Sequence, residues 1–227
     1  MAGQMVAFPS NGGTAQGYLA KPASGRGPGV LVIQEWWGLV DHIKDVAERF
    51  AAEGFVALAP DLYHGQATSE PDEAGKLMMA LNIDQAARDL RGAAQYLLRE
   101  GSVTSRQVGV VGFCMGGQLA LYAATVAPDE IGAVADFYGI HPNVQPDLSK
   151  LKAPVLGAFA EQDGFVPVQA VRELEAKLRA QGVETDFKIY AGTQHAFFND
   201  TRPEVYNESA ARDAWGRTVN WFRKHLQ

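Results

Sequence analysis

The sequence predicts an α/β fold, with a mainly parallel central sheet covered by helices on both faces. Short apolar runs alternate along the chain with segments of helical length. Most of these runs are typical of strands buried on both faces, as parallel sheets require. The chain has 227 residues, of which 47% are hydrophobic, so it can bury one sizeable core. We therefore expect one domain over residues 1–227.

The expected strands begin with an antiparallel pair, Met5 to Phe8 and Ala15 to Ala20, joined by the turn residues Ser10 to Gly13. The buried strands follow in order. They are Gly29 to Ile33, Phe55 to Ala59, Val108 to Val111, Ala133 to Phe137, Val155 to Phe159 and Phe187 to Tyr190.

Helices with one apolar face fall between these strands. They are expected from Asp41 to Gly54, around Ile83 to Leu97, from Val168 to Gly182, and from about Ser209 to Leu226. The stretch Gly65 to Leu81 is rich in small and polar residues. It is expected to form either a lid beside a site or a surface excursion.

Composition excludes several classes of function. A net charge of −6 argues against binding to nucleic acid or anionic membranes. There is no run of 18 apolar residues and no basic region followed by an apolar stretch at the N-terminus, so neither a membrane span nor a signal peptide is expected. A single cysteine excludes an internal disulfide and suits a reducing compartment. We expect a cytoplasmic monomer.

That cysteine, Cys114, lies within residues 112–116, between an apolar run and the helix-like stretch Gln118 to Ala127. A strand, a sharp turn and a helix follow one another, with sulfur in place of the serine of a G-x-S-x-G elbow. Gly112 and Gly116 suit this crowded turn because they lack a Cβ. We expect a nucleophile whose pKa is lowered by the N-terminal end of the following helix. The alternative is a small buried apolar residue.

Two partners follow in the order acid, then histidine, as in an α/β-hydrolase. Asp163 lies in the turn after the strand ending near Phe159, and it is preferred to Glu161 because it extends further past the sheet edge. His195 lies in the loop after the last strand. In such a triad the acid orients the imidazole, which takes the proton of the nucleophile.

The other histidines are weaker candidates. His42 lies at a helix start and His225 in the terminal helix, whereas His64 and His141 follow strands and are candidates for the rim of the site.

A second chemical feature is the loop Gln34 to Gly38, which follows an early strand. In this fold two backbone N–H groups bind the oxyanion, one after the nucleophile and one from such a loop. By position these belong to Met115 and Trp36. Glu35 is expected either to be a buried structural acid or to restrain the thiol, since a nearby carboxylate raises the pKa of a thiol.

Together these residues resemble the dienelactone hydrolases, or carboxymethylenebutenolidases. The resemblance covers essentially the whole chain. Its motifs are Gln34-Glu35 with Gly38, residues 59–63, residues 112–117, Asp163, residues 195–197, residues 200–203, and Tyr206-Asn207. It implies an α/β-hydrolase fold, a Cys-His-Asp triad, no cofactor, and hydrolysis of an enol lactone or related ester. It also implies that Glu35 holds the thiol at rest and releases it when substrate binds.

The resemblance is imperfect at the substrate site. In the family that this sequence resembles, two arginines bind a carboxylate of the substrate, one in the lid region and one four residues after the triad histidine. Here Asn199 stands at the second position, and the stretch Gly65 to Leu81, which matches the lid region, contains no arginine. Arg202 and Lys76 are possible substitutes. The sequence therefore leaves open a substrate that is an ester, lactone or thioester without that carboxylate. The residues expected to contact substrate are Trp37, Tyr63, Tyr138, Phe197 and Asn199.

The expected reaction is acyl capture by Cys114, followed by hydrolysis of the thioester. Another carboxylesterase or thioesterase activity is one alternative. A redox-sensing thiol lacks a second cysteine to form an internal disulfide. A non-catalytic ligand-binding protein would not need all three triad residues, and a site for metal lacks ligand spacing.

Overall fold

The computed structural model describes residues 3–10 and 12–227, so Asn11 of the expected first turn lies outside the described residues. One sheet of eight strands has the order β1-β2-β4-β3-β5-β6-β7-β8. The strands are β1 (Gln4–Ser10), β2 (Gly13–Ala20), β3 (Gly29–Ile33), β4 (Val56–Pro60), β5 (Val108–Phe113), β6 (Ile131–Phe137), β7 (Val155–Ala160) and β8 (Thr185–Tyr190).

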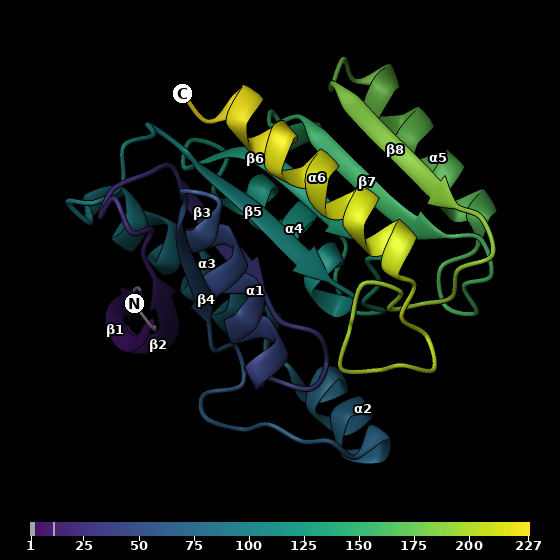
Figure 1. Ribbon diagram of the computed structural model, residues 1–227, viewed down its shortest axis with the longest axis horizontal. Helices are drawn as coiled ribbons and strands as arrows, with labels where there is room; N and C mark the ends of the chain where they lie inside the picture. The colour runs from purple at the N-terminus through teal and green to yellow at the C-terminus, as the bar shows by residue number, and fades with distance from the viewer. Residues whose placement is uncertain (1–2, 11) are drawn as a thin grey trace.

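The predicted α/β fold with a mainly parallel sheet is confirmed. Strands β3 to β8 pair in parallel, whereas β1 and β2 form an antiparallel extension next to β4. Figure 1 shows the arrowheads of β5, β6 and β7 pointing to the same side of the molecule. Loops that follow the parallel strands therefore meet at one edge of the sheet.

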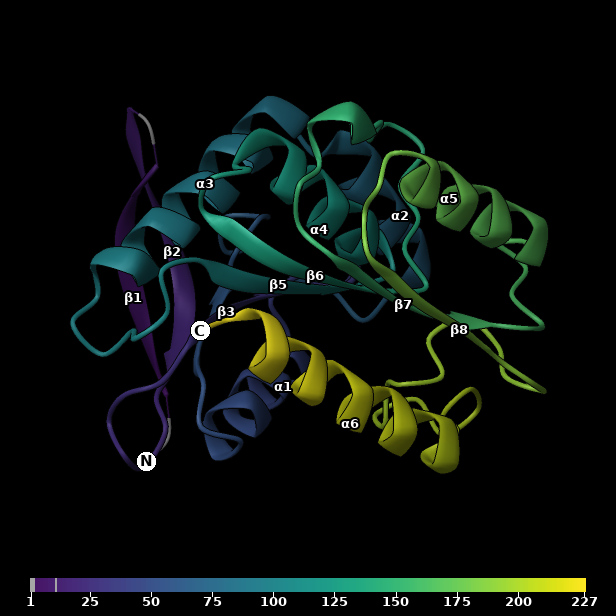
Figure 2. The same ribbon diagram turned by 90° about the horizontal axis from the view of Figure 1, so that it is seen from above.

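Helices cover both faces of the sheet (Figure 2). The helices α1 (Asp41–Ala52) and α6 (Glu208–His225) lie on one face. The opposite face carries α3 (Ile83–Arg99), α4 (Met115–Val126) and α5 (Val168–Ala180). Strands β3, β4, β5 and β7 are buried along their whole length, because helices pack on both of their sides.

The stretch Gly65 to Leu81 contains a helix that the sequence pattern did not reveal, α2 (Pro71–Ala80). Pro71 occupies its first turn together with Asp72 and Glu73, which are ordinary signals of a helix start. Only Ala74 is buried in this helix, so it lacks the wide apolar stripe by which the other helices were predicted.

Candidate active site

Cys114 occupies the turn between β5 and α4. Its backbone has φ 55° and ψ −121°, a region that residues with side chains rarely adopt. A Cβ on Gly112 would collide with the backbone oxygen of Gly116, and a Cβ on Gly116 would collide with the backbone oxygen of Gln34. The two glycines therefore let strand, turn and helix approach one another closely.

Backbone hydrogen bonds on both sides hold this turn. The N–H of Cys114 donates to the carbonyl of Phe137 at 3.0 Å. The carbonyl of Cys114 accepts from the N–H groups of Gly117 at 2.9 Å and Ile140 at 3.1 Å. Since Phe137 ends β6 and Ile140 follows it, the neighbouring strand fixes the orientation of the cysteine.

The thiol is buried, with 8% of the cysteine exposed. Burial raises the pKa of Cys114 to about 12, and the negative charges of Glu35 and Asp163 add to this rise. The backbone N–H groups of Met115 and Trp36 face the sulfur and lower its pKa, but by less. The prediction of a lowered pKa is therefore wrong for this conformation, because desolvation and two carboxylates outweigh the end of the helix.

The structure pairs Asp163 with His195. The Nδ1 atom of His195 lies 2.8 Å from Oδ2 of Asp163. The other carboxylate oxygen accepts the N–H groups of Phe165 at 2.8 Å and Val166 at 3.0 Å, so the acid is held from both sides. The alternative acid, Glu161, instead accepts the N–H of Gly192. The hydrogen bond to His195 contributes to keeping the pKa of Asp163 below its usual value, against the opposing effect of burial.

Two aromatic rings border the imidazole of His195. The ring of Tyr138 lies 5.1 Å from it, and the ring of Phe165 lies 5.0 Å away in an edge-to-face arrangement. Tyr138 is fully buried, whereas Phe165 is 61% exposed. Sequence reasoning missed Phe165, although its position two residues after Asp163 could have suggested it.

Glu35 is buried close to the thiol, and it is 1% exposed. Its Oε2 atom accepts a hydrogen bond of 2.7 Å from Nδ2 of Asn199. Burial raises the pKa of Glu35, while nearby His42, Asn199 and His195 oppose that rise. Asn199, expected to contact substrate, thus contacts the acid instead in this conformation.

The other residues expected to contact substrate lie in different surroundings. Phe197 is fully buried and packs against Tyr138 and Tyr190. The hydroxyl of Tyr63 donates to the sulfur of Met115 at 3.2 Å, directly beside the nucleophile position.

Trp37 lines a pocket of about 410 Å³ together with Asn199 and Arg202. The guanidinium of Arg202 lies 5.9 Å from the ring of Trp37. Lys76, the other candidate cation, pairs with Glu73 on an exposed helix turn.

The other four histidines have different neighbours. The Nδ1 atom of His42 lies 3.4 Å from Oδ1 of Asp200. His64 pairs with Asp89, and His225 packs on Trp221. The Nε2 atom of His141 lies 3.2 Å from the carbonyl of Met78 in α2.

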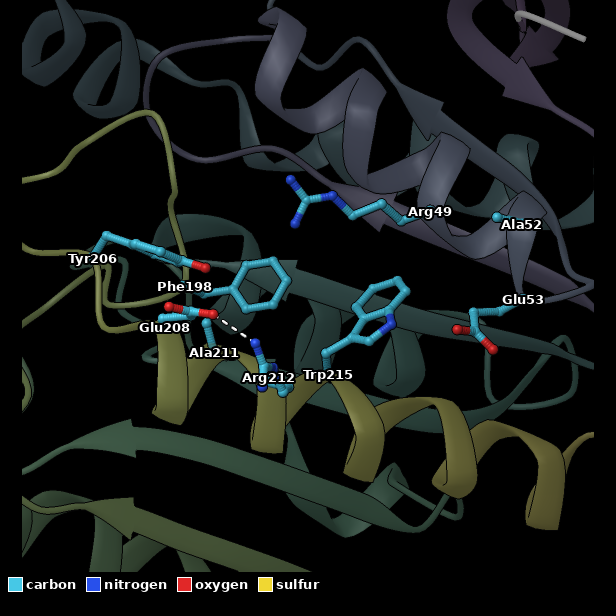
Figure 3. Close-up of a pocket in the computed structure, with 9 residues that line it drawn as sticks. All are labelled: Arg49, Ala52, Glu53, Phe198, Tyr206, Glu208, Ala211, Arg212 and Trp215. Carbon is cyan, nitrogen blue, oxygen red and sulfur yellow. Dashed lines mark hydrogen bonds and ion pairs between the residues drawn. The ribbon is translucent and has the colours of Figure 1, made fainter.

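Another pocket, of about 320 Å³, lies between α1 and α6. Figure 3 shows Arg212 directed toward Glu208 in this pocket, with Phe198 and Trp215 nearby. Arg49 is likewise bound to carboxylates. None of Cys114, Asp163 and His195 lines this pocket, and its arginines are already neutralised, so it is not the candidate site.

The described part of the chain contains neither a cluster of metal ligands nor a helix suited to spanning a membrane. Within residues 3–10 and 12–227, no three His, Cys, Asp or Glu side chains are grouped so as to hold a metal ion. Over the same residues, none of the helices combines the length and the apolarity needed to cross a bilayer.

The sheet, the glycine-flanked turn and the acid–histidine pair after later strands define a protein of the α/β-hydrolase class. Comparison with known proteins narrows this class. The family model of the "Dienelactone hydrolase family" matches residues 15–226. The chain belongs to this family.

Similar proteins extend over the full chain. "Protein usf" of Aquifex pyrophilus is 41% identical over 99% of both chains. A protein of Aquifex aeolicus named "Putative carboxymethylenebutenolidase" is 38% identical, covering 99% of this chain and 100% of its own. The solved structure of a Klebsiella pneumoniae protein named "Putative Dienelactone Hydrolase" superposes with a TM-score of 0.88 at 30% identity, covering 98% of each chain.

Proposed function

We propose that this protein hydrolyses an enol lactone or an activated ester through Cys114, His195 and Asp163. The main support is the 2.8 Å hydrogen bond between His195 and Asp163, at the sheet edge where β5 also presents Cys114. Membership of the dienelactone hydrolase family supports the same reaction class.

In the proposed reaction, the sulfur of Cys114 attacks the carbonyl carbon while His195 takes the thiol proton. The N–H groups of Met115 and Trp36 bind the resulting oxyanion. The carbon–oxygen bond then breaks, and His195 returns the proton to the leaving oxygen. Water, deprotonated by His195, attacks the thioester and releases the acid and the thiol. Asp163 orients the imidazole throughout.

The proposal includes control of the thiol by Glu35. The neutral thiol is favoured in this conformation, since burial and Glu35 both raise the pKa of Cys114. Substrate that displaces Glu35 or shields its charge would lower that pKa. The reactive thiolate would then form only when a carbonyl is present to receive it.

The leaving group should be a stabilised enolate or a phenolate. Thiolate is itself a good leaving group, so a tetrahedral intermediate with a poor leaving group returns to the starting ester. Amides are therefore expected to be poor substrates.

Asn199 stands at a position where the family has an arginine, and its side-chain amide donates a hydrogen bond to Glu35. This observation favours a second candidate, an esterase acting on substrates without a carboxylate.

Turnover of phenyl acetate tests the proposal. We expect a burst of phenol followed by steady turnover in the native protein. Cys114→Ala should lower kcat/KM by at least about 10³-fold without loss of fold by circular dichroism. Unchanged turnover in a folded Cys114→Ala variant would exclude this nucleophile.

A further inference from the structure

A groove of about 500 Å³ lies between α4 and α5, bordered by the loop after β6. Its volume is within the range of small-molecule sites, and such sites are mostly apolar. Apolar side chains form most of its lining, including Leu121, Ile140, Phe159, Val171 and Leu174. None of the residues assigned so far to the reaction lines it.

One end of the groove meets the candidate active site at Phe165. This ring lines the groove, is 61% exposed, and packs edge-to-face against His195 at 5.0 Å. Ile140, which also lines the groove, donates its N–H to the carbonyl of Cys114. Two residues that line the groove thus contact the base and the backbone of the candidate nucleophile.

The charges of the groove fit an uncharged occupant. Its lining contains one acidic and one basic residue, Glu173 and Lys177, both on α5. His141 is buried, and its Nδ1 accepts the N–H of Asn143, as the neutral ring requires. Burial also lowers the pKa of His141. The groove thus offers no unbalanced charge to an ionic ligand.

We infer that this groove binds the alcohol half of the substrate, and that this half is an elongated, uncharged, apolar group. The inference rests on the proposed function, and within it on the activated ester, because the leaving oxygen of a lactone stays attached to the acyl group. The imidazole must protonate the leaving oxygen, so the leaving group lies on the histidine side of the nucleophile. Because Phe165 lines one end of the groove and packs against His195, that end of the groove lies on the histidine side.

Two series of esters separate the two halves of the substrate. The first comprises acetates of phenol, 4-propylphenol and 4-pentylphenol, in which chain length changes while the acidity of the leaving phenol hardly does. The second comprises phenyl acetate, butyrate and hexanoate. We measure kcat/KM, which reports the acylation half of the reaction. In the native protein it should rise about two- to fourfold per CH₂ along the first series.

Ala170→Trp and Ala176→Trp form a matched pair for this test. Both alanines are exposed on α5, but only Ala170 lines the groove. We expect Ala170→Trp to abolish the rise along the alkylphenyl series while leaving phenyl acetate and the acyl series within about twofold of the native protein. Ala176→Trp should behave like the native protein in both series.

A kcat/KM that does not rise along the alkylphenyl series in the native protein would overturn the inference. Three other results would do the same. One is a rise along the alkylphenyl series that survives Ala170→Trp. Another is a loss confined to the acyl series. The third is a preference for an alkylphenyl acetate that ends in a carboxylate over its neutral isostere. By contrast, absence of Cys114-dependent hydrolysis of phenyl acetate in the native protein would overturn the proposed function, and with it the inference.

Discussion

At the residue scale, the thiol of Cys114 is subject to opposing influences. Burial, Glu35 and Asp163 favour the neutral thiol, whereas the N–H groups of Met115 and Trp36 favour the thiolate. Because burial is the largest of these, the isolated protein should react slowly with alkylating agents at neutral pH.

Removal of the charge of Glu35 should speed alkylation. In Glu35→Gln, the side-chain oxygen can still accept from Asn199, so the site keeps its shape. The pKa of Cys114, which burial and the charge of Glu35 raise in the native protein, should fall. The measurement is the rate of iodoacetamide modification between pH 7 and 10. Equal rates for variant and native protein across this range would show that Glu35 does not restrain the thiol.

Asp163→Asn tests the orientation of the imidazole. An amide can still accept the N–H groups of Phe165 and Val166, but its NH₂ group would then face Nδ1 of His195. The proton would move to Nε2, which could no longer act as base. We expect kcat to fall on the order of 10³–10⁴-fold with the melting temperature nearly unchanged. A decrease below tenfold would contradict the role assigned to this acid.

At this scale the sequence predicts which residues form the candidate site, but it does not predict their electrostatics. The order of Cys114, Asp163 and His195 follows from motifs and loops, and the structure brings His195 and Asp163 into contact. The raised pKa of Cys114 depends on burial, which no local pattern reveals. The same holds for the contact between Glu35 and Asn199, which are separated by 164 residues.

At the scale of elements, the turn between β5 and α4 depends on glycine. Gly112→Ala would place a methyl group against the backbone of Gly116, which cannot move without displacing α4. We expect a loss of more than about 4 kcal/mol in the free energy of unfolding, measured by urea denaturation, or failure to fold.

Gly216→Ala is the matched control. Gly216 lies within α6, and a Cβ there meets no atom within 4 Å. Alanine should stabilise the helix by up to about 1 kcal/mol. Similar changes in stability for Gly112→Ala and Gly216→Ala would contradict the close packing of the turn.

The strands and the amphipathic helices could be predicted because each has a local pattern. The wholly apolar run Gly29–Ile33 indicated a strand covered on both faces, as β3 is. Helix α2 has only one buried residue, Ala74, so its start signals at Pro71 and Asp72 were not accompanied by an apolar stripe. The groove between α4 and α5 is formed by elements distant in sequence and has no local signal.

At the scale of the whole molecule, Asp136 couples stability to pH. It is fully buried beneath the elbow, where the backbone N–H of Gly139 lies near its carboxylate without completing a hydrogen bond. Burial raises its pKa from 3.8 to about 7, only partly opposed by the N–H of Gly139. The folded protein therefore prefers the protonated acid, and stability is lost as pH rises from about 4 to 7.

Asp136→Asn should remove this dependence. The variant should match the native protein at pH 4 and exceed its free energy of unfolding at pH 8 by on the order of 1–3 kcal/mol. Urea denaturation at both pH values measures the difference. The exposed Asp129→Asn serves as control and should leave the slope unchanged. An Asp136→Asn variant less stable than native protein at pH 8 would contradict this account.

The sheet joins distant parts of the chain into one site. Glu35 follows β3, Cys114 follows β5, Asp163 follows β7 and His195 follows β8, and these four strands run parallel in one sheet. Parallel strands bring their carboxyl ends to a common edge, so a mainly parallel sheet was enough to predict that the loops carrying these residues lie at one edge. Their exact contacts depend on the conformations of the loops after these strands, and loops have no regular sequence pattern from which a conformation could be predicted.

The most direct test of the account is the identity of the atom that receives the acyl group. Native protein mixed with phenyl acetate is quenched in acid during the burst, digested, and analysed by mass spectrometry. The account predicts one acetyl group on the peptide containing Cys114, and none in Cys114→Ala. An acetyl group on another residue, or a burst of phenol with no acylated Cys114, would contradict it.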